Sequence, residues 1–376
     1  TAQIDALCAQ INPGAVADIP TGVGFCMYIR RDCLAHVGLF DIENFGQGYG
    51  EENDFCQRAA LAGWRNLHAL DTFVRHTGGV SFGDSKNPRE KAAQAILQRL
   101  HPDYETTVQA FVAQDPAKPY RHALDLARLR AIPLPRVLTV LHNAGGGTRR
   151  HAEELVAYLA KQIVSFSLVP LPDHFVHLQW EAPNESLQLH YHWPTQSDAL
   201  LTMLRDIGIS HVHYHHLLGV DPEIMLIPQQ LGITYDFTAH DYYTACPQIA
   251  LVDTHHNYCG EQGLAQCTAC LAQRPAPTGE SIEDWRLRHR LFLHNARYLL
   301  TPSRDAAQRL QRYFPTANLR FAPHLDMATD ATVPQPHPRR LSTEAHLRIL
   351  VIGAVNEVKG ADILEATALQ AARTSA

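Results

Sequence analysis

The first third of the chain combines one short apolar run with two helical patterns. Residues 25–29 are almost wholly apolar, which predicts a buried strand. The pattern over residues 51–62 predicts a helix that Gly63 closes, and a second helix is predicted over residues 88–100. Beyond them, proline-rich sequences bracket a short helical pattern, so we expect a linker over residues 116–135.

From residue 136 onward, apolar runs alternate with helical patterns. The run over residues 136–141 is typical of a parallel strand covered on both faces, and a turn of three glycines separates it from a helix that reaches residue 159. Further strands are predicted over residues 166–169, 211–214, 234–238, 298–300 and 348–352, and further helices over residues 198–206, 222–231, 282–294 and 303–313. This alternation predicts a doubly wound, Rossmann-like α/β domain.

The two patterns divide the chain. We expect a first domain over residues 1–115, the linker, a second domain over residues 136–340 and the start of a third over residues 341–376. The sequence opens on Thr1 rather than Met and stops soon after a new strand–helix pattern has begun. We therefore expect it to be a piece of a longer protein.

Composition excludes several classes of protein. The 376 residues are 45% hydrophobic and 19% charged, which is enough apolar material for packed cores. A formal net charge of -6 argues against a broad basic surface, so no nucleic-acid partner is expected. No apolar run approaches the roughly 20 residues that a membrane helix needs, and no signal peptide opens the chain. We therefore expect a cytoplasmic protein whose 8 cysteines are reduced.

Three carboxylates, Glu51, Glu52 and Asp54, lie where a glycine-rich loop enters the first predicted helix. A helix N-terminus stabilises an anionic side chain by about 0.3–1 kcal/mol, and Asp54 can pair with Arg58 at i,i+4 spacing. A capped helix start is therefore one interpretation. A site for acid–base chemistry is the other, because a general base needs a carboxylate within hydrogen-bond reach of the attacking oxygen.

The wider pattern adds a resemblance. Several short motifs follow one another in an order that resembles the C-terminal half of family-2 glycosyltransferases. They are Thr21-Gly22, Arg30-Arg31, residues 37–41, the acidic turn, Gly63-Trp64 and residues 76–82. That family has the GT-A fold and mostly inverts the anomeric carbon. The resemblance implies that Glu52, with Glu51 as the alternative, is the general base on the acceptor hydroxyl. It implies that Asp54 orients the helix or contacts the acceptor, and that His76 helps bind the diphosphate or a divalent metal, Mg²⁺ or Mn²⁺. The metal-binding Asp-x-Asp motif of the family would precede Thr1.

In the second domain, Gly145, Gly146 and Gly147 follow a predicted strand and open a helix, where backbone amides favour a diphosphate. A tight strand–helix turn is the alternative interpretation. His215 and the pair His240-Asp241 lie at the carboxyl ends of predicted strands, the edge at which open α/β sheets bind ligands. The spacing of the histidines fits no common ligand set, so no histidine metal site is expected.

The order of these motifs, continued by residues 351–354 and Lys359-Gly360, resembles the N-terminal domain of family-4 glycosyltransferases, which have the GT-B fold and usually retain anomeric configuration. The resemblance implies that the glycine turn faces the donor diphosphate. It implies that His240 and Asp241 lie near the acceptor and the anomeric centre, with His215 on the acceptor side. Lys359 would neutralise the phosphate leaving group, so this half needs no metal for its chemistry. The family's Glu-x7-Glu element would follow Ala376.

The loop after His240 contains four cysteines. Cys246, Cys259, Cys267 and Cys270 have the spacing C-x12-C-x7-C-x2-C, which fits a tetrahedral, all-thiolate zinc site. Four separate buried thiols and a redox role are the alternatives. The same run resembles an insertion in one branch of family-4 enzymes, which implies that the cysteines act as a set.

Together the two resemblances imply a bifunctional glycosyltransferase that builds bacterial surface polysaccharide. Its partners would be a nucleotide-diphosphate sugar and a glycan or lipid-linked acceptor, and a lipid-linked acceptor would bring peripheral contact with the inner face of the membrane. Three alternatives remain: a nucleotide-sugar epimerase on a GT-B scaffold, a binding module whose transferase sites have decayed, and an interaction module organised by zinc.

Overall fold

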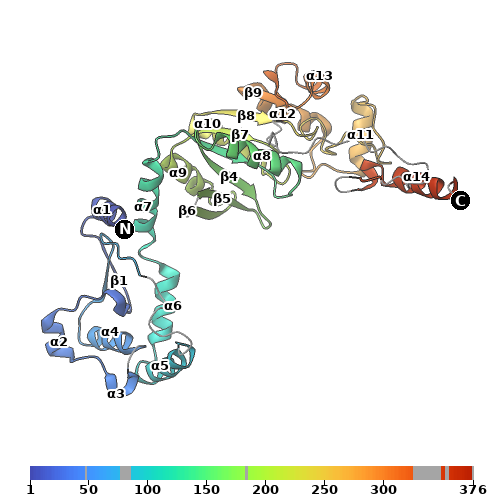
Figure 1. The fold of residues 1–376 in the computed structure, drawn as a ribbon. Coiled ribbons are helices and arrows are strands. Elements are labelled where there is room, and N and C mark those ends of the chain that lie inside the picture. Colours follow the sequence, from blue (N-terminus) through green and yellow to red (C-terminus); the bar gives the residue numbers. More distant parts are fainter. Residues whose placement is uncertain (47–48, 77–85, 183–184, 325–348, 352–354, 375–376) are drawn as a thin grey trace, which may run out of the picture. The chain divides into compact units, whose positions relative to one another are not determined.

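The computed structural model describes residues 1–46, 49–76, 86–182, 185–324, 349–351 and 355–374 (Figure 1). The chain divides into two compact units, Thr1–Pro133 and Leu134–Ala376. Parts of the motifs at residues 76–82 and 351–354, and of the strand predicted over residues 348–352, lie outside the described residues. Among the helices that are described, none is both long and apolar enough to cross a membrane.

The first unit is mostly helical. Its elements are α1 (Ala2–Ile11), β1 (Val16–Asp18), η1 (Gly24–Cys26), α2 (Arg31–Val37), α3 (Ile42–Phe45), α4 (Glu51–Leu61), β2 (Leu67–Ala69), α5 (Lys86–Leu100), α6 (Tyr104–Gln114) and α7 (Lys118–Arg130). Strands β1 and β2 pair antiparallel. The helices predicted over residues 51–62 and 88–100 are confirmed as α4 and α5. Residues 116–135, predicted as a linker, contain α7, and Ala117 and Tyr120 belong to a small core with Ala17 and Leu70.

The strand predicted over residues 25–29 is wrong. Residues Gly24–Cys26 form a single 3-10 turn, and two side chains that were expected to be buried are exposed, 49% for Phe25 and 92% for Tyr28. An apolar run becomes a buried strand only if another strand pairs with it and a layer covers it. The only pairing within the described part of this unit joins β1 to β2, so the run lies on the surface.

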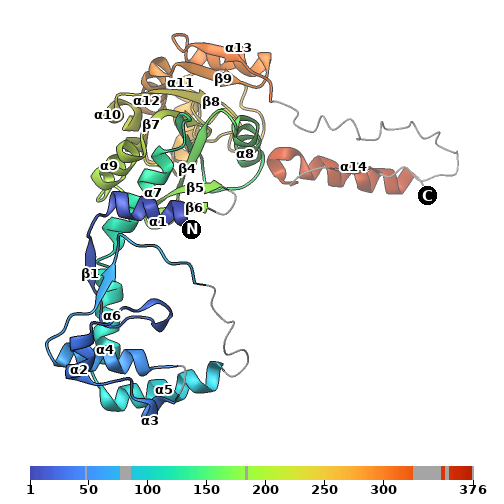
Figure 2. The same cartoon turned by 60° about the vertical axis from the view of Figure 1, so that its left-hand side comes forward.

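The second unit is built on one eight-stranded sheet with the order β10-β9-β8-β7-β3-β4-β5-β6. Its strands are β3 (Arg136–Val140), β4 (Val164–Pro170), β5 (Phe175–Ala182), β6 (Glu185–His192), β7 (Ile209–Tyr214), β8 (Thr234–Thr238), β9 (Tyr298–Thr301) and β10 (Leu319–Phe321). The strands from β10 to β4 are parallel, and β5 and β6 add an antiparallel hairpin at one edge. In Figure 2 the labelled strands follow this order downward from β9 to β6. The predicted α/β class is confirmed.

Helices join the parallel strands. They are α8 (Gly147–Leu159), α9 (Ser197–Ile207), η3 (Pro222–Leu226), α10 (Ile227–Leu231), α11 (Leu264–Gln273), α12 (Ile282–Asn295) and α13 (Arg304–Tyr313), followed by η4 (Glu357–Lys359) and α14 (Ala361–Thr374). The strands predicted near residues 136, 166, 211, 234 and 298 are confirmed, and their inward side chains form the core. Leu138, Val212 and Leu299, for example, are fully buried. Burial of each such side chain contributes about 1.5–3 kcal/mol.

The connections create a switch point beside β3. The chain passes from β3 to β4 on one side, and after the hairpin it returns to pair β7 on the other side of β3. At such a point the connections at the carboxyl ends of adjacent strands diverge, and open α/β sheets bind their ligands there. We therefore expect the functional site beyond the carboxyl ends of β3 and β7.

Candidate functional site

Histidines follow the carboxyl ends of several parallel strands of the sheet. His142 follows β3, His215 and His216 follow β7, His240 follows β8 and His324 follows β10. The carboxyl ends of parallel strands meet at one edge, so residues that are far apart in sequence lie together there.

Three imidazoles gather at this edge, and we call them the histidine cluster: His151, His215 and His240. One ring nitrogen from each lies within 4.8 Å of the other two. The Nδ1 of His215 and the Nε2 of His240 are 3.2 Å apart. The ring centroid of His151 lies 5.7 Å from that of His215 and 5.2 Å from that of His240. The ring centroids of His215 and His240 are 5.5 Å apart. His324 stacks on His151 at 3.9 Å.

Burial keeps the cluster uncharged. Desolvation, followed by the neighbouring histidines, holds the pKa of His215 well below its ordinary value and lowers the pKa of His240 to about 3. The pKa of His151 is lowered for the same reasons. The imidazoles are therefore neutral at pH 7, and each has one ring nitrogen that carries a lone pair, one of which accepts the hydrogen bond between His215 and His240.

The residue after His240 belongs to a neighbouring group. The carboxylate of Asp241 accepts hydrogen bonds from His216 Nε2 at 2.8 Å and from the backbone N–H of Tyr243 at 2.9 Å. The ring of His216 lies 4.8 Å from that of His142. Asp241 is thus oriented toward His216. His142 Nδ1 is buried and has no hydrogen-bond partner within the described part of the chain.

The glycine turn lies next to these residues in the sequence and opens α8. Gly146 has φ +91° and ψ -161°, a conformation that is essentially restricted to glycine. A Cβ atom built on Gly145, Gly146 or Gly147 would meet nothing within 4 Å. The N-terminus of α8 is therefore open, and its backbone amides can approach an anion closely.

Lys359 stands apart from this edge. It is exposed in η4, whose Glu357 is hydrogen-bonded to His256 at 2.5 Å. Among the described residues no hydrogen bond or ion pair joins Lys359 to the histidine cluster.

In the first unit, the carboxylates of the acidic turn have different environments. Asp54 is 2% exposed, and its oxygens are 2.8 Å from both Arg58 Nε and His101 Nε2. The predicted i,i+4 pair of Asp54 with Arg58 is therefore confirmed, and His101 is a second partner of the same carboxylate. Glu51 and Glu52 are half-buried in the first turn, and the carboxylate of Glu52 lies beside Gly24, where an added Cβ would be 3.8 Å from its Oε1.

His76, the predicted diphosphate or metal ligand of this unit, is exposed. Its ring stacks on that of Phe25 at a centroid distance of 4.5 Å and an interplanar angle of 11°. The glycine-rich stretch that follows it lies outside the described residues. Among the described residues, His76 is thus placed in an aromatic contact with Phe25.

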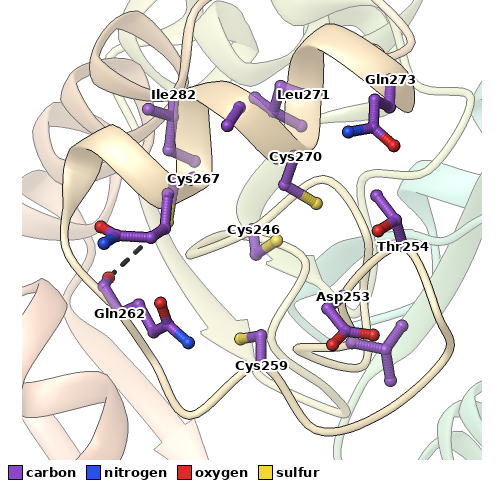
Figure 3. Close-up of a pocket in the computed structure, with 13 residues that line it drawn as sticks. Cys246, Asp253, Thr254, Cys259, Gln262, Cys267, Cys270, Leu271, Gln273 and Ile282 are labelled. Carbon is purple, nitrogen blue, oxygen red and sulfur yellow. Dashed lines mark hydrogen bonds between the residues drawn. The ribbon is translucent and has the colours of Figure 1, made fainter.

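The four cysteines line one cavity of about 230 Å³ between α11 and the loop after β8 (Figure 3). All four thiols are free, and burial raises the pKa of Cys246 and Cys270. Cys267 Sγ lies 3.5 Å from the guanidinium of Arg286. Within the described residues these cysteines form no group of three or more that is already placed to hold a metal ion, so a metal would have to draw the sulfurs closer.

Several residues at the sheet edge were not predicted from the sequence: His142, His151, His216 and His324. For His151 a local feature existed, because it lies four positions after Gly147 and thus one turn into the helix that the glycines open.

No protein-family model matches this chain, and no curated protein matches it. The function is therefore inferred from the residues and their geometry.

Proposed function

We propose that the unit Leu134–Ala376 is the N-terminal part of a GT-B-type glycosyltransferase, with the start of its second domain, and that it takes a nucleotide-diphosphate sugar as donor. The observation that supports the proposal best is the switch point between β3 and β7, where a glycine turn opens α8 beside a group of histidines. Open parallel sheets bind nucleotide ligands at this position.

The chemistry of the edge suits a diphosphate linked to a sugar. The α8 N-terminus offers unobstructed backbone amides to the anion, and the positive end of the helix dipole strengthens their attraction. The buried Nδ1 of His142 would gain a partner from a bound ligand, and an unsatisfied buried polar atom otherwise costs about 1–3 kcal/mol. Both features favour a polar ligand in front of the turn.

The histidines would orient the sugars rather than donate protons. Because the pKa of His240 is about 3, its neutral ring exchanges hydrogen bonds with sugar hydroxyls but is a poor general acid. Asp241 would hold His216 in place, and His215 would act on the acceptor side. Lys359 would neutralise the leaving phosphate from the second domain. We assign no protein nucleophile.

For the unit Thr1–Pro133 we propose the C-terminal part of a GT-A glycosyltransferase with Glu52 as general base and Glu51 as the alternative. The different environments of the carboxylates in α4 support this assignment, because the oxygens of Asp54 are already hydrogen-bonded to Arg58 and His101. Mg²⁺ or Mn²⁺ and His76 would serve the donor diphosphate. The parent protein would then carry out two transfers on one growing glycan.

Binding of nucleotide diphosphates tests the second unit. We expect UDP, GDP or dTDP, or their sugars, to bind the chain in isothermal titration, and Gly147→Val to raise Kd at least tenfold because the valine fills the open space before α8. Ala160→Val, at the other end of the same helix, is the matched control. Failure of all these ligands to bind the unaltered chain, or equal affinity of the Gly147 variant, would contradict the proposal.

Transfer by the parent protein tests the first unit. We expect Glu52→Gln to lower the rate of one transfer by about 10²–10⁴, the usual contribution of a general base. Asp54→Asn should instead destabilise the unit by about 2 kcal/mol, because it weakens hydrogen bonds between charged groups. Unchanged transfer in both Glu52→Gln and Glu51→Gln would exclude this base.

For the cysteine loop we propose a structural zinc site. All four thiols border the same cavity, and their spacing supplies a complete all-thiolate ligand set. Such a site would fix the long loop between β8 and α12 and take no part in chemistry.

A further inference from the structure

We propose that His151, His215 and His240 form a binding site for a divalent transition metal, with Zn²⁺ as the preferred ion, at the carboxyl edge of the parallel sheet. This site is separate from the cysteine loop. It goes beyond the proposed sugar transfer and does not depend on it, because metal binding is measured directly.

The spacing of the ring nitrogens fits such an ion. Zinc binds imidazole nitrogen at about 2.0–2.1 Å in tetrahedral geometry, which separates two ligand nitrogens by about 3.3 Å. The Nδ1 of His215 and the Nε2 of His240 are 3.2 Å apart, and the nitrogen of His151 completes a set within 4.8 Å. Two of the three nitrogens thus already have tetrahedral spacing, and the nitrogen of His151 must move closer to complete the set.

Rigid elements hold these ligands. His215 follows β7, and its backbone N–H donates to the carbonyl of Val140 at the end of β3 at 2.8 Å. Ala239, just before His240, donates to the carbonyl of Leu300 in β9 at 2.9 Å. His151 lies in the second turn of α8. Ligands on strand ends and a helix keep their positions better than ligands on a loop, so the site is preformed.

The donor set selects the kind of metal. Three imidazoles suit Zn²⁺, Cu²⁺ or Ni²⁺, whereas Mg²⁺ and Mn²⁺ prefer carboxylate and water oxygens. The nearest carboxylate in sequence, Asp241, is occupied by His216 and Tyr243. Three neutral ligands leave the full charge of the ion uncompensated and one coordination position open. Such an ion attracts an anion or polarises a bound oxygen, as catalytic rather than structural zinc sites do.

Zinc titration tests the histidine site after the cysteine thiols have been blocked so that they cannot bind zinc. The chain is first treated with N-ethylmaleimide, and mass spectrometry confirms that the loop thiols are blocked. We expect the blocked protein to retain one zinc site in isothermal titration. His151→Phe, His215→Asn and His240→Asn should each raise the Kd for Zn²⁺ at least 100-fold, since loss of outer-shell partners alone costs about 10–100-fold. Mg²⁺ should not compete.

His190→Phe is the matched control, because His190 is an exposed histidine that stacks on His177 elsewhere on the same sheet. It should bind zinc as the unaltered chain does. Circular dichroism and the thermal midpoint show which variants fold. If one cluster variant does not fold, the other two still test the site. The proposal is overturned if the blocked protein binds no zinc, or if the folded cluster variants bind it as tightly as the control.

Discussion

The second unit has two groups of potential metal ligands, and the two groups lie on different kinds of secondary-structure element. The histidine cluster comes from strand ends and one helix turn, and its nitrogens lie within 4.8 Å of one another. Two of the four cysteines come from the long loop after β8 and two from α11, and all four border a cavity of about 230 Å³. From the sequence, a metal at the cysteines was one of several open alternatives, and a metal at the histidines was not expected.

The difference shows what spacing along the chain can reveal. Ligands on one loop are separated by few residues, so a set such as C-x12-C-x7-C-x2-C is recognisable before any fold is known. Ligands at the edge of a parallel sheet are separated by whole strand–helix connections, whose lengths obey no ligand rule. The absence of a familiar spacing therefore excludes a site on a loop, but not one at a sheet edge.

The largest expected effect concerns the cysteine loop. If zinc closes it, removal of the ion by a chelator should lower the free energy of opening of this region by up to about 4 kcal/mol when zinc is present at about 1,000 times its Kd. Hydrogen exchange of the α11 amides measures this change, and Cys259→Ser should reproduce it. Cys26→Ser, an exposed cysteine of the first unit, is the control. If Cys259→Ser has the same zinc content and the same α11 hydrogen exchange as the unaltered chain, the four thiols are independent. The cysteine loop would then not be a metal site.

A buried histidine outside the cluster provides the second test. His289 in α12 is fully buried, its Nδ1–H donates to the carbonyl of Trp285 at 2.8 Å, and its Nε2 has no partner among the described residues. Burial lowers its pKa to about 4. As pH falls from about 6.5 toward 4, His289 therefore binds a proton in the unfolded chain but not in the folded chain. The free energy of unfolding decreases over this pH range.

Between about pH 7 and pH 5 this single group should account for about 2 kcal/mol. His289→Phe should remove that part of the slope in urea unfolding of the metal-free protein, whereas His294→Phe, exposed on the same helix, should leave it. An unaltered slope in His289→Phe would mean that burial alone does not keep these imidazoles neutral, and the same explanation for the cluster would weaken.

The smallest expected effect concerns the turn that positions His151. Gly146→Ala places a Cβ at φ +91° and ψ -161°, so we expect a loss of about 1 kcal/mol from backbone strain alone, because no atom lies within 4 Å of the new methyl group. Gly145→Ala, equally open but without positive φ, should be neutral. Urea unfolding at constant pH compares the two. Equal stability would show that the turn adapts and does not fix the start of α8.

The parallel strands could be predicted because they are buried on both faces and read as apolar runs, as Leu138 and Val140 in β3 illustrate. The hairpin β5–β6 could not be found in that way. Buried Leu178 and Trp180 alternate with the more exposed His177 and Gln179, and an alternating strand has no apolar run. The wrong strand at residues 25–29 is the reverse case, an apolar run for which the fold supplies no partner.

The sequence by itself determined most of the parallel strands of the second unit and the helices that join them, the glycine turn before α8 and the grouping of the four cysteines. These features are local, since they depend on neighbouring residues and their backbone preferences. Only the tertiary structure decided that His151, His215 and His240 share one edge, that Asp241 is oriented toward His216, and that Asp54 is held by His101. The physical reason is that strand order and parallel pairing set these distances, and the chain length between the residues does not.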